Sequence, residues 1–76
     1  MKVKTLTGRI NLVQEERFRL LAESGRAYLL VLAHNSQVTV DDLLEWYRSG
    51  NWVRVEYEGE PNFESGIAHR AWPLSH

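Results

Sequence analysis

The sequence contains no cysteine. A disulfide framework and a zinc site built from thiolates are therefore excluded, and packing must stabilise the fold. No apolar run approaches the ~20 residues that span a bilayer, and the first nine residues lack the hydrophobic segment of a signal peptide. With 76 residues and no repetitive or strongly polar tract, the chain is expected to form one ordered domain over residues 1–76, cytoplasmic and without a membrane partner.

The net charge is also close to zero, because nine basic and ten acidic side chains leave a formal charge of −1. No global field therefore attracts the molecule to nucleic acid or to an anionic membrane. Binding to such partners requires local segregation of charge.

Catalytic motifs are absent: there is no P-loop, no nucleophile elbow, no zinc-protease helix and no Gly-rich dinucleotide turn. The serines lie at predicted turns or termini, and no local base is recognisable for any of them. A domain of this size has no second lobe with which to close a pocket. We therefore expect no catalytic residues, no enzymatic activity and no small-molecule cofactor.

The histidines give two alternatives. His34 and His69 lie in predicted strands that could meet across a barrel, where Glu64 would complete a zinc site. The simpler interpretation gives each histidine one hydrogen bond. We expect no metal site.

What the sequence does contain is strand-type alternation. It predicts strands over residues 3–12, 17–24, 27–34, 51–59 and 65–72, the last ending before Pro73. Gly8 indicates a bend or bulge in the first strand. Ile10, Leu12, Phe18 and Leu20 are expected to face the core. The third strand is apolar on both faces, and a strong turn is expected over residues 59–62.

One segment has helical spacing instead. Val40, Leu43, Leu44 and Tyr47 form a predicted buried stripe, with Trp46 at its margin. Thr39 is the expected N-cap, with Asp42 at N3, and Gly50 is the expected stop.

Three strands, a helix and two further strands resemble the OB-fold, a five-stranded barrel. A bend at Gly8 fits this resemblance, because the long first strand of such a barrel serves both halves of the sheet. An SH3-like barrel is the alternative, but it has no full helix between its third and fourth strands. The chain also resembles small bacterial single-domain proteins. The OB-fold resemblance implies binding of oligonucleotides, oligosaccharides or proteins, and fold alone does not choose among them.

The candidate residues form two sets. A surface for single-stranded DNA or RNA would use basic side chains for phosphates and flat ones for bases; its candidates are Arg9, Asn11, Arg17, Arg19, Tyr28 and Trp52. A protein-interaction or self-association surface is the alternative; its candidates are Trp52, Arg54, Arg70 and Trp72. With a hairpin centred near Asn62, Trp52 would face Trp72 and Arg54 would face Arg70. Carboxylates around residues 15–16 and 56–64 would give the groove acidic edges, or would only make loops soluble.

Overall fold

A computed structural model of the chain describes residues 3–59 and 66–74. The elements follow the expected order: β1 (Lys4–Gln14), β2 (Arg17–Ala22), β3 (Ala27–Leu32), α1 (Val40–Ser49), β4 (Trp52–Glu58) and β5 (Gly66–Pro73). Observed boundaries differ from the predicted ones by up to two residues, and β5 includes Pro73. Most of the turn predicted over residues 59–62 lies outside the described residues.

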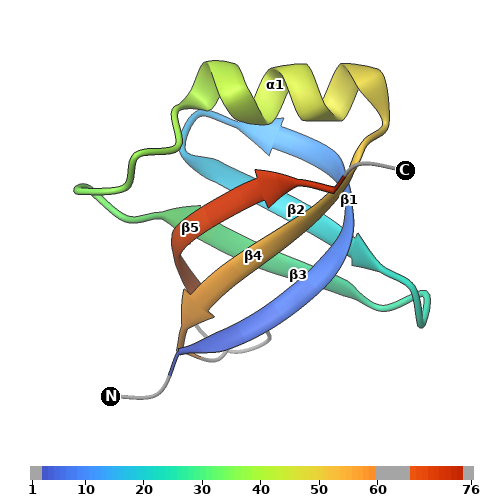
Figure 1. The fold of residues 1–76 in the computed structure, drawn as a ribbon, viewed down its shortest axis with the longest axis horizontal. Coiled ribbons are helices and arrows are strands. Elements are labelled where there is room, and N and C mark those ends of the chain that lie inside the picture. The colour runs from blue at the N-terminus through green and yellow to red at the C-terminus, as the bar shows by residue number, and fades with distance from the viewer. Residues whose placement is uncertain (1–2, 60–65, 75–76) are drawn as a thin grey trace.

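The strands form a closed barrel in the order β1-β2-β3-β5-β4 (Figure 1). β1 pairs antiparallel with both β2 and β4, and β3 pairs parallel with β5. Figure 1 shows α1 lying across one end of this barrel. The predicted architecture is confirmed: a mainly β chain forms a five-stranded closed barrel, with a single helix between β3 and β4 in the part of the chain that the structure describes.

β1 is shared between two neighbours around Gly8, which pairs with Ala22 of β2 and with Val53 of β4. The Leu21 carbonyl approaches this position so closely that a Cβ would lie 2.3 Å from its oxygen. The break in register lies further along, between Ile10 and Leu12. Gly8 thus permits a close backbone approach, and the bulge falls near Asn11.

The bulge changes which residues face the core. Ile10, Phe18 and Leu20 are buried as predicted, but Leu12 pairs with the outward-facing Arg19 and is only half-buried. Val13, which pairs with Phe18, packs against the core in its place. The prediction for Leu12 was wrong because an extra residue reverses the alternation of a strand. The buried core comprises Ile10, Phe18, Leu20, Leu30, Leu43, Val53, Val55, Tyr57 and Ala68.

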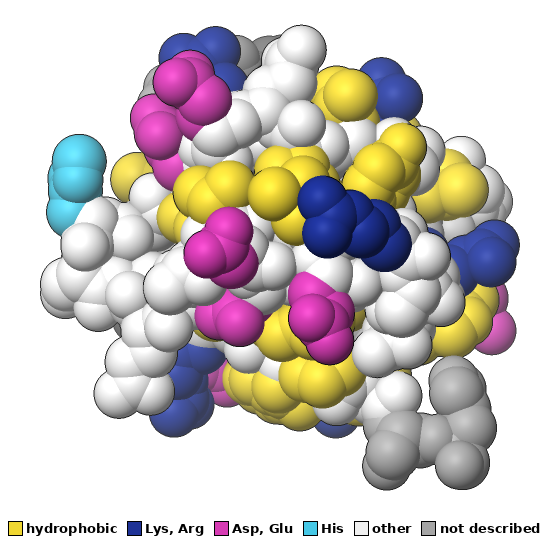
Figure 2. All heavy atoms as spheres, turned by 90° about the horizontal axis from the view of Figure 1, so that it is seen from above, with side chains coloured by type: hydrophobic (Ala, Val, Ile, Leu, Met, Phe, Trp, Pro, Cys, Tyr) yellow, Lys and Arg dark blue, Asp and Glu magenta, His cyan; other side chains and the backbone are white. Residues whose placement is uncertain are grey.

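α1 begins at the predicted capping box, in which Thr39 and Asp42 each bond the other's backbone N–H, and it ends at the left-handed Gly50. Its buried side differs from the predicted stripe. Leu43 is fully buried and Trp46 packs against the core, whereas Tyr47 is 47% exposed. The helix covers the barrel end through a narrow stripe, so the flank with Val40 and Leu44 is half-buried. Figure 2 shows this side, where hydrophobic side chains lie next to acidic ones.

The register between β4 and β5 also differs from the expected one. Arg54 pairs with Trp72, and Glu56 pairs with Arg70. The expected pairs of Trp52 with Trp72 and of Arg54 with Arg70 were wrong by two residues. Register in a hairpin follows the length of its connection, which the sequence pattern does not give.

Candidate functional site

Three arginines lie on the outer faces of β1 and β2. Arg9, Arg17 and Arg19 are exposed, while the residues that alternate with them, Gly8, Ile10, Phe18 and Leu20, are buried. Arg17 and Arg19 are two positions apart on one strand, about 7 Å along its axis. We call Arg9, Arg17 and Arg19 the arginine surface.

The bulge in β1 helps to orient this surface. Asn11, at the bulge, accepts a hydrogen bond on Oδ1 from Nε of Arg19 at 3.0 Å. The two predicted binding residues are therefore in direct contact. Because one guanidinium N–H is satisfied by an amide oxygen, the charge of Arg19 is retained and its remaining donors stay available.

The three arginines of the arginine surface differ from Arg70 in their ion pairing. Among the described residues, no carboxylate forms an ion pair with Arg9, Arg17 or Arg19. Arg70 donates to Oε1 of Glu56 at 2.7 Å, and this hydrogen bond together with the charge of Glu56 raises the pKa of Arg70. Arg54 resembles the first group, since its Nε donates to the Thr7 hydroxyl at 3.4 Å.

Trp52 lies next to the arginine surface on β4. It pairs with Arg9, whose guanidinium carbon is 5.3 Å from the centroid of the indole ring. This geometry is a cation–π contact. Trp52 is half-buried, while Trp72 is 37% exposed next to Arg54. The structure thus brings Trp52 together with Arg9, and not with Trp72.

Tyr28 is not brought onto the arginine surface. It pairs with the buried Leu20 and is in phase with the buried Leu30, so it belongs to the inward-facing positions of β3. Arg26 lies over its ring at 6.0 Å. The sequence of β3 is apolar at consecutive positions, so it does not show which face points inward. The pairing register between β2 and β3 shows it.

The outward face of β3 adds apolar residues that the sequence reasoning did not select. Leu29 pairs with Arg19, and Val31 pairs with both Arg17 and Ile67. Leu29 is 39% exposed and Ile67 is 46% exposed. The sequence does indicate outward-facing apolar residues, because this strand is apolar at consecutive positions. No pattern shows which of these residues face outward.

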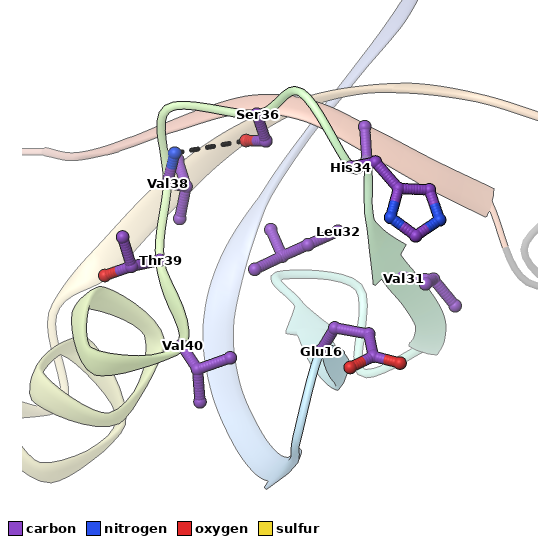
Figure 3. Close-up of a pocket in the computed structure, with 9 residues that line it drawn as sticks. Glu16, Val31, Leu32, His34, Ser36, Val38, Thr39 and Val40 are labelled. Atoms are coloured by element: carbon purple, nitrogen blue, oxygen red, sulfur yellow. Dashed lines mark hydrogen bonds between the residues drawn. The ribbon is translucent and has the colours of Figure 1, made fainter.

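A cavity of about 310 Å³ opens at the barrel end near the start of α1. In Figure 3, Leu32 lies in the middle, with Val38 and Val40 on the helix side and Glu16 and His34 on the other. The wall is fixed by Ser36, whose hydroxyl donates to the carbonyl of His69 at 3.0 Å and accepts from Val38 N. Arg17 of the arginine surface directly follows Glu16, which lines this cavity.

A second cavity of about 350 Å³ lies beside Trp52. It is lined by Thr7, Glu23, Trp52 and Leu74. Two residues of the arginine surface thus have a neighbour that lines a cavity: Glu16 precedes Arg17 in the chain, and Trp52 pairs with Arg9.

His69 is held by a carboxylate, since its Nε2 is hydrogen-bonded to Oε1 of Glu58. No group of three metal-ligating side chains occurs within residues 3–59 and 66–74. Glu64, the third ligand of the zinc alternative, lies outside those residues. None of the helical structure in the described ranges is long and apolar enough to cross a membrane.

Comparison of the chain with protein-family models, with curated proteins and with solved structures gives no match.

Proposed function

We propose that the protein is a non-enzymatic module that binds single-stranded nucleic acid on the arginine surface. The observation that carries this proposal is the group of exposed Arg9, Arg17 and Arg19 beside the indole of Trp52, and none of these arginines forms an ion pair with a carboxylate in the described part of the chain. Phosphates require cations, and unstacked bases require flat side chains. Both kinds of side chain occur on adjoining strands.

The fold supports an OB-type assignment and the same proposal. The strand order β1-β2-β3-β5-β4, the pairing of β1 with β4 and the position of α1 support this assignment. Such barrels take their oligonucleotide ligands on the face of the second and third strands and its neighbouring loops. Arg17 and Arg19 lie on this face.

The distribution of carboxylates also supports the proposal, although the net charge is −1. Asp41, Asp42 and Glu45 lie on α1 at the barrel end. Glu56 and Glu58 are paired with Arg70 and His69. These five described carboxylates therefore lie on the helix or are paired with a basic side chain. Only Glu15, Glu16 and Glu23 lie near the arginine surface among the described carboxylates.

The proposal is tested by fluorescence anisotropy with a labelled oligothymidylate of about seven nucleotides, within the usual site size. Each phosphate contact on a single strand contributes about −0.7 to the slope of log K against log salt. Three arginine contacts predict a slope near −2, so that affinity falls roughly twentyfold between about 50 and 200 mM salt.

A double variant identifies the surface. Arg17→Gln with Arg19→Gln is expected to reduce the magnitude of the slope by about 1.4. The matched control is Arg48→Gln with Arg70→Gln, which removes the same charge from α1 and from the ion pair with Glu56. The proposed surface would be disproved if the two double variants reduced the salt slope equally, or if the native protein itself gave a salt slope of zero.

The second candidate function is a protein-interaction or self-association module. It is favoured by the exposure of Trp72 on β5 beside Arg54, and of Leu29 and Ile67 around β3. Exposed apolar side chains of this size are common at protein contacts. Sedimentation equilibrium at rising protein concentration tests it. The average molar mass of the native protein should increase with concentration, and that of Trp72→Ala should increase less. A single monomer mass over the whole range would exclude self-association.

A further inference from the structure

We propose that the cavity beside Trp52 selects guanine in the bound strand and that Glu23 determines this preference. The inference rests on the proposed function, because it concerns one base position of the same single-stranded ligand. It deepens that function from general affinity for a strand to recognition of one base.

The cavity is shallow and open to solvent, and an aromatic and an apolar side chain contribute to its lining. Trp52 supplies an indole face of the kind on which bases stack. Leu74 lies against the same cavity, held by a hydrogen bond from its N–H to the Trp52 carbonyl at 2.7 Å. The Arg9 guanidinium lies over one face of the indole, 5.3 Å from the ring centroid, so a base would stack on the part of the ring that Arg9 does not cover, next to this cation.

Glu23 lies at this cavity because of a tight turn between β2 and β3. The N–H of Ala22 donates to Arg26 O at 2.8 Å, and that of Gly25 donates to Ala22 O at 2.9 Å. Gly25 has a φ of 91°, which other residues rarely adopt. Since Ala22 pairs with Gly8, the next positions are Glu23, in the turn directly after β2, and Thr7 of β1. Backbone hydrogen bonds thus fix the main chain on either side of Glu23, and the exposed Glu23 lines the cavity.

A carboxylate beside a stacked base distinguishes the four bases by their donors. An ionised carboxylate only accepts hydrogen bonds, through two oxygens. Guanine presents two adjacent donors, N1–H and the N2 amino group, on its pairing edge. Adenine and cytosine present one amino donor next to an acceptor, and thymine or uracil presents one N–H between two acceptors. Guanine is therefore the base that a carboxylate can bind in a bidentate manner.

Thr7 completes the pairing edge. Its Oγ1 accepts a hydrogen bond from Nε of Arg54 at 3.4 Å, which leaves its O–H free to donate. The acceptor next to guanine N1–H is O6. Glu23 and Thr7 together thus supply two acceptor oxygens and one donor, the complement of the guanine edge. Arg54 also adds a positive charge beside Thr7, which offsets repulsion between the Glu23 carboxylate and the phosphates.

The experiment compares four oligonucleotides of about seven residues. One is an oligothymidylate, and the others carry a single central guanine, adenine or cytosine. We expect the guanine-containing strand to bind about tenfold more tightly than the oligothymidylate, a difference of about 1.4 kcal/mol, because only guanine makes the bidentate contact. Glu23→Gln should abolish the preference, because its amide places a donor where guanine also has one. Its affinity for oligothymidylate should stay equal or rise.

The control variant is Glu45→Gln, which removes one negative charge from the exposed side of α1 and should retain the guanine preference. Circular dichroism checks that both variants are folded. Equal, salt-dependent binding of all four strands would overturn the guanine inference and leave the proposed function standing. A guanine preference that survives Glu23→Gln would overturn the role of Glu23. Failure of all four strands to bind would overturn both proposals.

Discussion

At the residue scale, a single methyl group at position 8 is expected to destabilise the barrel. A Cβ at Gly8 would lie 2.3 Å from the oxygen and 2.8 Å from the carbon of the Leu21 carbonyl, and backbone atoms cannot easily move aside. Gly8→Ala should therefore lower the free energy of unfolding by about 1–3 kcal/mol, the usual cost of overpacking, measured by urea denaturation. Gly25→Ala is the control: nothing lies within 4 Å of its Cβ, so only its φ of 91° should cost stability, about 1 kcal/mol. Equal losses would contradict the steric explanation.

At the scale of the element, the start of α1 depends on one reciprocal contact. Thr39 Oγ1 accepts from the N–H of Asp42 at 3.2 Å, and Asp42 Oδ2 accepts from the N–H of Thr39 at 3.0 Å. Thr39→Ala should lower the free energy of unfolding by about 1 kcal/mol. Glu45→Ala, on the exposed side of the same helix, should change it by less than about 0.5 kcal/mol. If the two variants are equally stable in urea, the capping box does not stabilise the helix.

At the scale of the whole molecule, the barrel is expected to open first where β3 meets β5. Among the described residues, these strands pair only over Leu30–Leu32 and Gly66–Ala68, whereas β1 pairs with β4 over Lys4–Arg9 and with β2 over Gly8–Gln14. The Ala33 N–H, which donates to Ala68 O at 2.9 Å, lies at this junction. Its hydrogen exchange should be at least about tenfold faster than that of amides in the middle of β1, measured by NMR. Equal exchange rates would instead indicate that the barrel opens as one unit.

Much of this fold could be predicted from the sequence, because the signals are local. The Thr39 and Asp42 capping box, the stop at Gly50 and the inward phase of Phe18 and Leu20 follow from neighbouring residues alone. The errors have one cause in common. The orientation of Leu12 depends on a bulge, the buried side of α1 depends on how the helix is rotated, and the pairing of Arg54 with Trp72 depends on the strand register. All three are fixed by contacts between distant segments.

The candidate site could be predicted in part for the same reason. Alternation identified the outward-facing Arg9, Arg17 and Arg19 and the out-of-phase Trp52. It could not place Tyr28, because β3 is apolar on both faces. It also missed Glu23, which acquires its position beside Thr7 only through the pairing of Ala22 with Gly8.

The bulge near Asn11 has a consequence for the recognition of related sequences. The residues of β1 that face inward are Leu6, Gly8, Ile10 and Val13, so their spacing is two, two and then three. A template with uniform alternation would align the first half of this strand correctly and the second half on the wrong face. A search for distant sequences with this fold should therefore use one alternating pattern before the bulge and a second one, shifted by one residue, after it. A deletion at the bulge would exchange the inward-facing and outward-facing residues of one half of the strand, and so would change the chemistry of its surface.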